Sequence, residues 1–112
     1  MKLTDSEWIV MKAVWEQQSP ASVRDVLERI EAETGWAYTT VKTMLERLVE
    51  KGALRVRKRA NTSLFAPVIT QRAARQSAVR ALIDRAFDGT FGSLLQHLVS
   101  DEKLSARDRL RL

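Results

Sequence analysis

The sequence contains no cysteine, a single histidine and only four glycines among its 112 residues. Without cysteine, disulfide bonds, thiolate metal sites and cysteine nucleophiles are all excluded. The glycines are dispersed, so no glycine-rich loop is available to cradle a phosphate. The lone His97 lies in an apolar stretch, where a surface or interface position is commoner than a catalytic one. We therefore expect no enzymatic activity, no cofactor and no metal site.

Long apolar runs are also missing. No stretch approaches the roughly 18 consecutive apolar residues that a membrane span requires. Residues 1–5 become polar and acidic at once, unlike a secretory signal peptide. We expect a cytoplasmic protein without membrane insertion.

The two prolines and few glycines, with 45% hydrophobic residues, indicate a helix-rich chain with one small core. The net charge is +5 and the sequence pI is about 10.1. This excess of cations is compatible with simple solubility. It is equally compatible with a polyanionic partner such as DNA. Charge alone does not decide between the two.

Two short helices are predicted at the start of the chain. Residues 4–16 begin with Thr4 and Glu7 at the spacing of a capping box, and an apolar stripe follows at helical spacing. This stripe is Trp8, Met11, Val14 and Trp15, and we expect both of its tryptophans to lie in the core. Pro20 separates this helix from a second one, which Ser22 caps and which ends before Thr34. Its predicted buried face is Val23, Val26, Leu27 and Ile30.

A third helix is predicted over residues 39–51, with Gly52 as a left-handed cap. Its apolar face is Val41, Met44, Leu45, Leu48 and Val49. The opposite face carries Thr39, Thr43, Glu46 and Glu50, flanked by Lys42 and Arg47.

After Gly52 the spacing of apolar residues changes from the period of a helix to the period of a strand. Residues 54–57 alternate apolar and basic side chains, and residues 63–66 form a second short strand. Residues 60–62 are the predicted turn, in which Asn61 tolerates positive φ. Three further helices are predicted: residues 70–87 capped by Thr70, a helix around residues 94–99, and one that starts at Ser105.

This order predicts a mostly α fold with a small β-hairpin. Residues 1–69 form a winged helix-turn-helix domain, and residues 70–112 form a helical dimerisation region. The winged helix alone has no place to bury the apolar side chains of the second part. A homodimer interface would cover them: Leu82, Ile83, Phe87, Leu94, Leu95 and Leu98.

The third helix has the surface chemistry of a DNA-recognition helix. The hydroxyls of Thr39, Thr40 and Thr43 are short enough to approach phosphates or base edges, and Lys42 and Arg47 supply donors. The following segment carries five cations within nine residues, at the position of a wing that lies along the phosphate backbone. These cations are Lys51, Arg55, Arg57, Lys58 and Arg59. An ordinary solvated face remains the alternative for both sets.

The chain also resembles the penicillinase repressor family of winged-helix regulators (the BlaI/MecI/CopY type). The likeness is carried by Leu3-Thr4-Asp5-Ser6-Glu7-Trp8, by Tyr38-Thr39-Thr40-Val41-Lys42-Thr43-Met44-Leu45 and by Arg47-Leu48-Val49-Glu50-Lys51-Gly52. It continues in Phe65-Ala66-Pro67 and from Phe87 to Leu95. The resemblance implies a homodimeric repressor on a dyad-symmetric operator, often of TACA/TGTA type. It implies DNA contacts at Thr39, Thr40, Lys42, Thr43 and Arg47, and wing contacts at Arg57, Lys58 and Arg59.

Family members commonly control β-lactam-resistance or copper-homeostasis genes, and some are cleaved in a sensor-protease pathway. The chain departs from the copper-sensing branch because it has no cysteine, and from the cleavable branch because His97-Leu98 stands in place of an Asn-Phe pair. The rival interpretation is a winged-helix module that binds proteins and whose basic wing is incidental.

Overall fold

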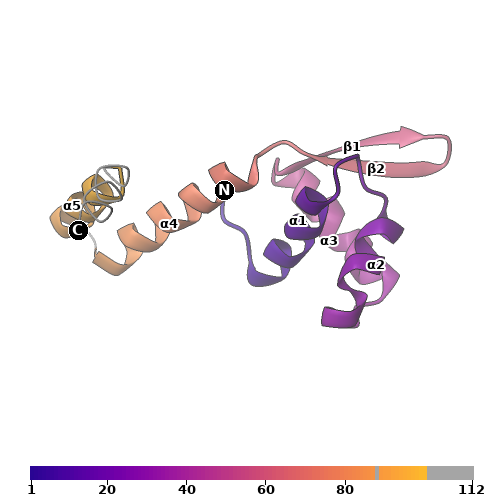
Figure 1. Cartoon of the computed structure of the whole chain (residues 1–112), viewed down its shortest axis with the longest axis horizontal. Coiled ribbons are helices and arrows are strands. Elements are labelled where there is room, and N and C mark those ends of the chain that lie inside the picture. Colours follow the sequence, from indigo (N-terminus) through magenta and orange to yellow (C-terminus); the bar gives the residue numbers. More distant parts are fainter. Residues whose placement is uncertain (88, 101–112) are drawn as a thin grey trace, which may run out of the picture. The chain divides into compact units, whose positions relative to one another are not determined.

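The computed structural model describes residues 1–87 and 89–100. The elements are α1 (Asp5–Glu16), α2 (Val23–Thr34), α3 (Tyr38–Glu50), β1 (Leu54–Arg59), β2 (Thr62–Pro67), α4 (Gln71–Phe87) and α5 (Gly89–Ser100) (Figure 1). The chain divides into two compact units, Met1–Ala74 and Arg75–Leu112. The fold is mostly helical with one antiparallel hairpin, as the sequence predicts.

Reciprocal capping boxes start the first two helices. In α1, the backbone N–H of Glu7 donates to Thr4 Oγ1 at 3.2 Å, and the N–H of Thr4 donates to Glu7 Oε1 at 2.8 Å. In α2, Ser22 and Asp25 exchange the same pair of bonds at 3.0 and 3.1 Å. Each box satisfies two N–H groups that have no partner within the helix. Both predicted helix starts are confirmed.

The buried face of α1 differs from the prediction. Its buried residues are Glu7, Val10, Met11, Ala13 and Val14. Trp8 and Trp15 are only half-buried, and their ring centroids lie 6.0 Å apart at the edge of this face. The prediction that both tryptophans lie in the core is wrong because the stripe that packs inward is centred one position away from them. The indole N–H of Trp15 instead donates to the carbonyl of Ile69 at 3.0 Å.

Helix α3 begins at Tyr38, one residue before the predicted start. Four apolar residues at one-turn spacing face the core: Val41, Met44, Leu45 and Leu48. Val49, predicted with them, is half-buried at the margin. The chain leaves the helix through Gly52, whose φ of +86° places it in the left-handed region. The predicted glycine cap is confirmed.

The hairpin is longer than predicted. Its strands pair from Leu54–Pro67 to Arg59–Thr62, and Ala21 bridges Phe65 at the base. Only Leu54 of β1 is buried. The two-residue turn has a positive φ of +56° at Ala60. Asn61 tolerates a left-handed backbone better than Ala60 does. The left-handed residue is nevertheless Ala60, because the strand register makes Ala60 the first of the two turn residues.

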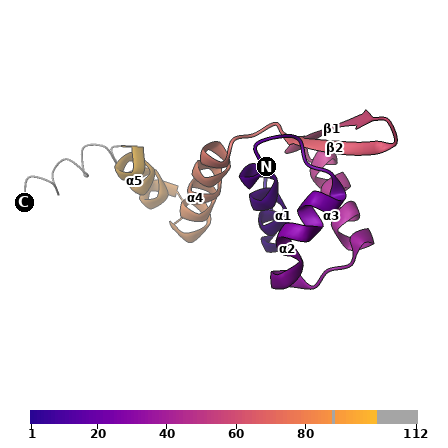
Figure 2. The same cartoon turned by 45° about the vertical axis from the view of Figure 1, so that its right-hand side comes forward.

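One core holds the first unit together. Helices α1, α2 and α3 pack around buried side chains that include Val10, Met11, Val26, Leu45 and Leu48. Leu54 and Phe65 extend this core to the base of the hairpin. Figures 1 and 2 show the hairpin lying along one side of the three helices. The core therefore fixes α3 with its opposite face outward.

Helix α4 begins at the predicted cap, near the end of the first unit, where the N–H of Ala73 donates to Thr70 Oγ1 at 3.1 Å. Within the second unit, Gln96 of α5 donates a hydrogen bond to Asp84 of α4. The predicted helix from Ser105 lies outside the described residues, as do the side chains of Phe87 and Leu95. The division into functional domains at residues 69 and 70 stays a prediction.

Candidate DNA-binding surface

The outward face of α3 carries every recognition residue that the sequence predicts. Thr39, Thr40, Lys42, Thr43 and Arg47 are all exposed. They are exposed because the apolar residues at positions 41, 44, 45 and 48 turn the other side of the helix inward. The helix thus presents short hydroxyls near its start and longer cations further along.

The two long cations of α3 lie on opposite sides of this face. Lys42 shares one side with Glu46 and Val49, which follow it at one-turn spacing and line a groove with it. Arg47 follows Thr40 and Thr43 at the same spacing on the side away from the groove. A helix that entered a DNA groove in this orientation would carry one cation along each of its edges.

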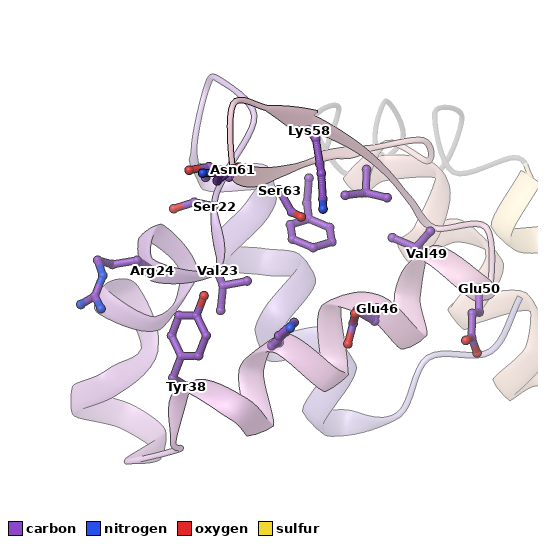
Figure 3. Close-up of a pocket in the computed structure, with 14 residues that line it drawn as sticks. Ser22, Val23, Arg24, Tyr38, Glu46, Val49, Glu50, Lys58, Asn61 and Ser63 are labelled. Atoms are coloured by element: carbon purple, nitrogen blue, oxygen red, sulfur yellow. The ribbon is translucent and has the colours of Figure 1, made fainter.

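The groove lies between α3, the start of α2 and the hairpin, and its volume is about 960 Å³. Figure 3 shows Tyr38, Glu46 and Glu50 along α3, with Lys58 and Ser63 of the hairpin across from them and Arg24 at the start of α2. Three cations and two carboxylates line it: Arg24, Lys42, Lys58, Glu46 and Glu50. Its charge is mixed, in contrast to the wing.

Strand alternation divides the cations of the wing. Val56 and Lys58 lie on the strand face that lines the groove, beside their cross-strand partners Phe65 and Ser63. Arg55, Arg57 and Arg59 occupy the alternate positions, which point to the opposite face of a strand. Lys58 is therefore brought together with Lys42, whereas Arg57 and Arg59 form a separate row.

Lys51, which the sequence predicts as a cation of the wing, forms an ion pair with Glu7 of α1. Its Nζ lies 2.6 Å from Glu7 Oε1 and donates to the carbonyl of Lys2 at 2.9 Å. Glu7 is 1% exposed, and its Oε2 has no hydrogen-bond partner among the described atoms. Lys51 therefore neutralises a buried carboxylate. The prediction that it belongs to the cations of the wing is wrong, because its ammonium group is bound to Glu7 and Lys2.

Two carboxyl groups on this unit have lowered pKa values. Burial raises the pKa of Glu7, but hydrogen bonds from Lys51 and from the Thr4 backbone outweigh it and hold the pKa below 4.5. The backbone N–H of Ser22 and the side-chain amide of Gln17 lower the pKa of Asp25. Both groups stay charged at neutral pH and fix the starts of α1 and α2.

Arg24 and Ser63 also line the groove, although neither is predicted from the sequence as a site residue. Arg24 is the second residue of α2, and Ser63 pairs with Lys58 across the hairpin. The capping box at Ser22 signals that Arg24 lies in the first helical turn. The position of that turn beside α3 depends on packing, which no local pattern encodes.

Among residues 1–87 and 89–100, no helix is both long and apolar enough to cross a membrane. Within the same residues, no group of three or more aspartate, glutamate, cysteine or histidine side chains converges as a metal site.

Three packed helices, an exposed third helix and a basic hairpin directly after it define a winged-helix regulator of the DNA-binding class. The chain belongs to the penicillinase repressor family, whose model matches residues 3–112. It is a DNA-binding transcriptional repressor.

Two relatives and one solved structure illustrate the similarity. The penicillinase repressor of Bacillus licheniformis is 26% identical over 107 residues, which cover 96% of this chain and 83% of the relative. The methicillin resistance regulatory protein MecI of Staphylococcus aureus is 25% identical over 104 residues, covering 93% and 84%. The Bacillus licheniformis BlaI monomeric form, solved in complex with the blaP half-operator, is 30% identical with a TM-score of 0.56. That match covers 65% of this chain and 88% of BlaI.

Proposed function

We propose that the chain represses transcription as a homodimer on a dyad-symmetric operator, with one winged helix on each half-site. The observation that carries this proposal is the exposed α3 face beside a basic hairpin. The major groove admits an α-helix, and the N-terminal part of such a helix reaches the base edges. The chain would act in the cytoplasm, where the operator lies.

In this arrangement the residues of α3 divide into two kinds. Thr39, Thr40 and Thr43 hydrogen-bond to phosphates or base edges near the start of the helix. Lys42 and Arg47 bind guanine O6 and N7, for which they are the commonest partners. Their positions on opposite edges of the face allow contacts to separate base pairs.

The wing positions the protein and does not read sequence. Arg57, Lys58 and Arg59 are exposed on the half of β1 next to the turn. Cations there bind phosphates, which fix orientation on the duplex for any sequence. Arg24 and Lys58 extend the same attraction into the groove.

Dimerisation is assigned to the second unit. Leu82, Leu94 and Leu98 are 57%, 54% and 53% exposed on α4 and α5, and Ile83 is half-buried. Large apolar side chains at this exposure in a single chain are covered when a second copy packs against them. The complex of monomeric BlaI with a half-operator supports one winged helix per half-site.

Control would then act on the dimer. Two linked winged helices bind two half-sites with a high effective concentration for the second contact. A sensor-protease pathway that damaged α5 would break this linkage, although His97-Leu98 is not the Asn-Phe pair of cleavable members. The first target genes to test are of the β-lactam-resistance type, because matched relatives carry such names.

A direct test combines a salt titration with sedimentation. Duplex DNA from the region upstream of the chain's own gene should bind far more tightly than a shuffled duplex, and log K should fall linearly with log salt. The full chain should sediment as a dimer at micromolar concentration. Equal affinity for both duplexes would overturn sequence-specific repression, and a monomeric full chain would overturn the homodimer.

A further inference from the structure

Two carboxylates lie on the surface assigned to DNA. Glu46 and Glu50 are exposed on α3 and line the groove beside Lys42. In the described part of the chain, the ion pairs join Arg29 to Glu16 and Lys51 to Glu7. Glu46 therefore carries an unneutralised charge, even though Lys42 precedes it by one helical turn.

Such a charge is costly on a surface that docks on a polyanion. Phosphates repel a carboxylate, and an acceptor-only group gains nothing from guanine O6 or N7, which are acceptors themselves. The donors that the major groove offers are the amino groups of cytosine and adenine. Adenine presents its N7 acceptor beside its amino group, whereas cytosine presents the amino group alone. A carboxylate in the groove is thus best matched by cytosine.

Of the two carboxylates, Glu46 has the better position. It lies four residues before the end of α3, one turn after Lys42 and next to Arg47, whereas Glu50 is the last residue of the helix and so lies further from its N-terminal part. Recognition helices reach base edges with their N-terminal part. Figure 3 shows Glu46 on the side of α3 that faces the groove, between Tyr38 and Glu50.

We propose that Glu46 is a specificity-determining residue that accepts a hydrogen bond from the N4 amino group of a cytosine in each half-site. The inference rests on the proposed function, since it assumes that α3 enters the major groove. Lys42, on the same side of the helix, supplies the opposite preference by binding guanine. Together the two side chains select a short G·C-containing step on one edge of the recognition face.

The test is a selection from a randomised duplex library with the full chain and three variants. Glu46→Gln should change the preferred base at one position per half-site from cytosine to adenine, because a glutamine amide binds adenine N6 and N7 together. Glu46→Ala should make that position degenerate and leave the others intact. Glu33→Gln is the matched control, since Glu33 is exposed on α2 and lies outside the groove. It should keep the parent motif.

Titrations with the selected duplex make the result quantitative. Replacing the assigned C·G pair in the duplex should weaken binding of the parent protein by about tenfold. The same replacement should weaken binding of the Glu46→Ala variant by less than about twofold. Thermal unfolding checks that each variant is folded. An unchanged motif in both Glu46 variants would overturn the inference while leaving the proposed function intact. So would a uniform gain of affinity for all sequences, because it would mean that Glu46 only repels phosphate. If the parent enriched no motif, the proposed function would fail and this inference with it.

Discussion

At the scale of single residues, the contact between Glu7 and Lys51 joins parts of the first unit that lie far apart in the sequence. Glu7 caps α1 and receives Lys51 from the end of α3, at a sequence separation of 44 residues. Lys51 also reaches the carbonyl of Lys2. One carboxylate thus joins the N-terminal segment, α1 and the junction between the recognition helix and the wing.

This pair should make the winged helix sensitive to acid. The pKa of Glu7 is lowered on folding, so its contribution to stability is present above the ordinary value of 4.5 and is lost as the pH falls through the folded pKa. We expect Glu7→Gln to lower the free energy of unfolding by about 1–3 kcal/mol at pH 7, since it weakens a charged, buried hydrogen bond.

Urea denaturation from pH 7 down to pH 3 measures this effect. The difference between the parent and Glu7→Gln should shrink toward the acid end. The exposed Glu33→Gln is the control and should track the parent throughout. A constant difference at all pH values would mean that Glu7 contributes through its shape and not through its charge.

The turn of the wing gives a second prediction at this scale. Ala60 has a φ of +56°, a region that costs an L-residue roughly 1–2 kcal/mol. Glycine removes that cost but loses up to about 1 kcal/mol of chain entropy. Ala60→Gly should therefore raise the free energy of unfolding by up to about 1 kcal/mol, as measured by thermal melting. Asn61→Gly should lower it, and the opposite ranking would exclude backbone strain at Ala60.

At the scale of elements, the proposed function assigns base recognition to α3 and phosphate binding to the wing. The core side of α3 is apolar and its outer side polar, so substitutions on the outer side leave the fold intact. The wing projects cations from a hairpin of which only the base is buried. If the proposed roles hold, mutations should separate base recognition from phosphate binding.

Alanine substitutions should separate them. Lys42→Ala and Arg47→Ala should each cost about 1–3 kcal/mol on the operator and little on unrelated DNA. Arg57→Ala and Lys58→Ala should weaken both duplexes alike and reduce the salt slope by about one each. Anisotropy titrations at several salt concentrations give both quantities. Identical losses on both duplexes for the α3 variants would reduce α3 to a phosphate-binding element.

At the scale of the whole molecule, the proposed function gives the two compact units separate tasks. The first contains a complete core and the proposed DNA surface. The second exposes large apolar residues on α4 and α5. Under the proposed function, affinity for the operator should fall when the two copies separate, even though each winged helix stays folded.

Charged substitutions in the second unit test this division. Leu98→Asp or Leu82→Asp should yield monomers and lower operator affinity by at least about tenfold, or roughly 1.4 kcal/mol. The exposed Ser100→Asp adds the same charge at a polar position of α5 and serves as the control. Sedimentation, circular dichroism melting and a gel-shift titration follow assembly, fold and affinity. If the variants are folded and monomeric but bind the operator as tightly as the parent, dimerisation does not control operator binding.

Much of the fold could be predicted because its signals are local. The capping pairs Thr4/Glu7 and Ser22/Asp25, the left-handed Gly52 and the change of period after it act within a few residues of chain. The same holds for the exposed face of α3, since its apolar residues repeat at helical spacing. From these local features the sequence alone predicts the winged-helix fold and the position of its third helix.

Other features were decided by the tertiary structure alone. Packing chose which stripe of α1 faces inward, and so left Trp8 and Trp15 at its margin and buried Glu7. It brought Lys51 to that carboxylate, placed Arg24 beside the groove and set Lys42 opposite Lys58. Each depends on contacts between segments far apart in the chain. Their register is fixed by the shared core, whose contacts the periodicity of one helix or strand does not encode.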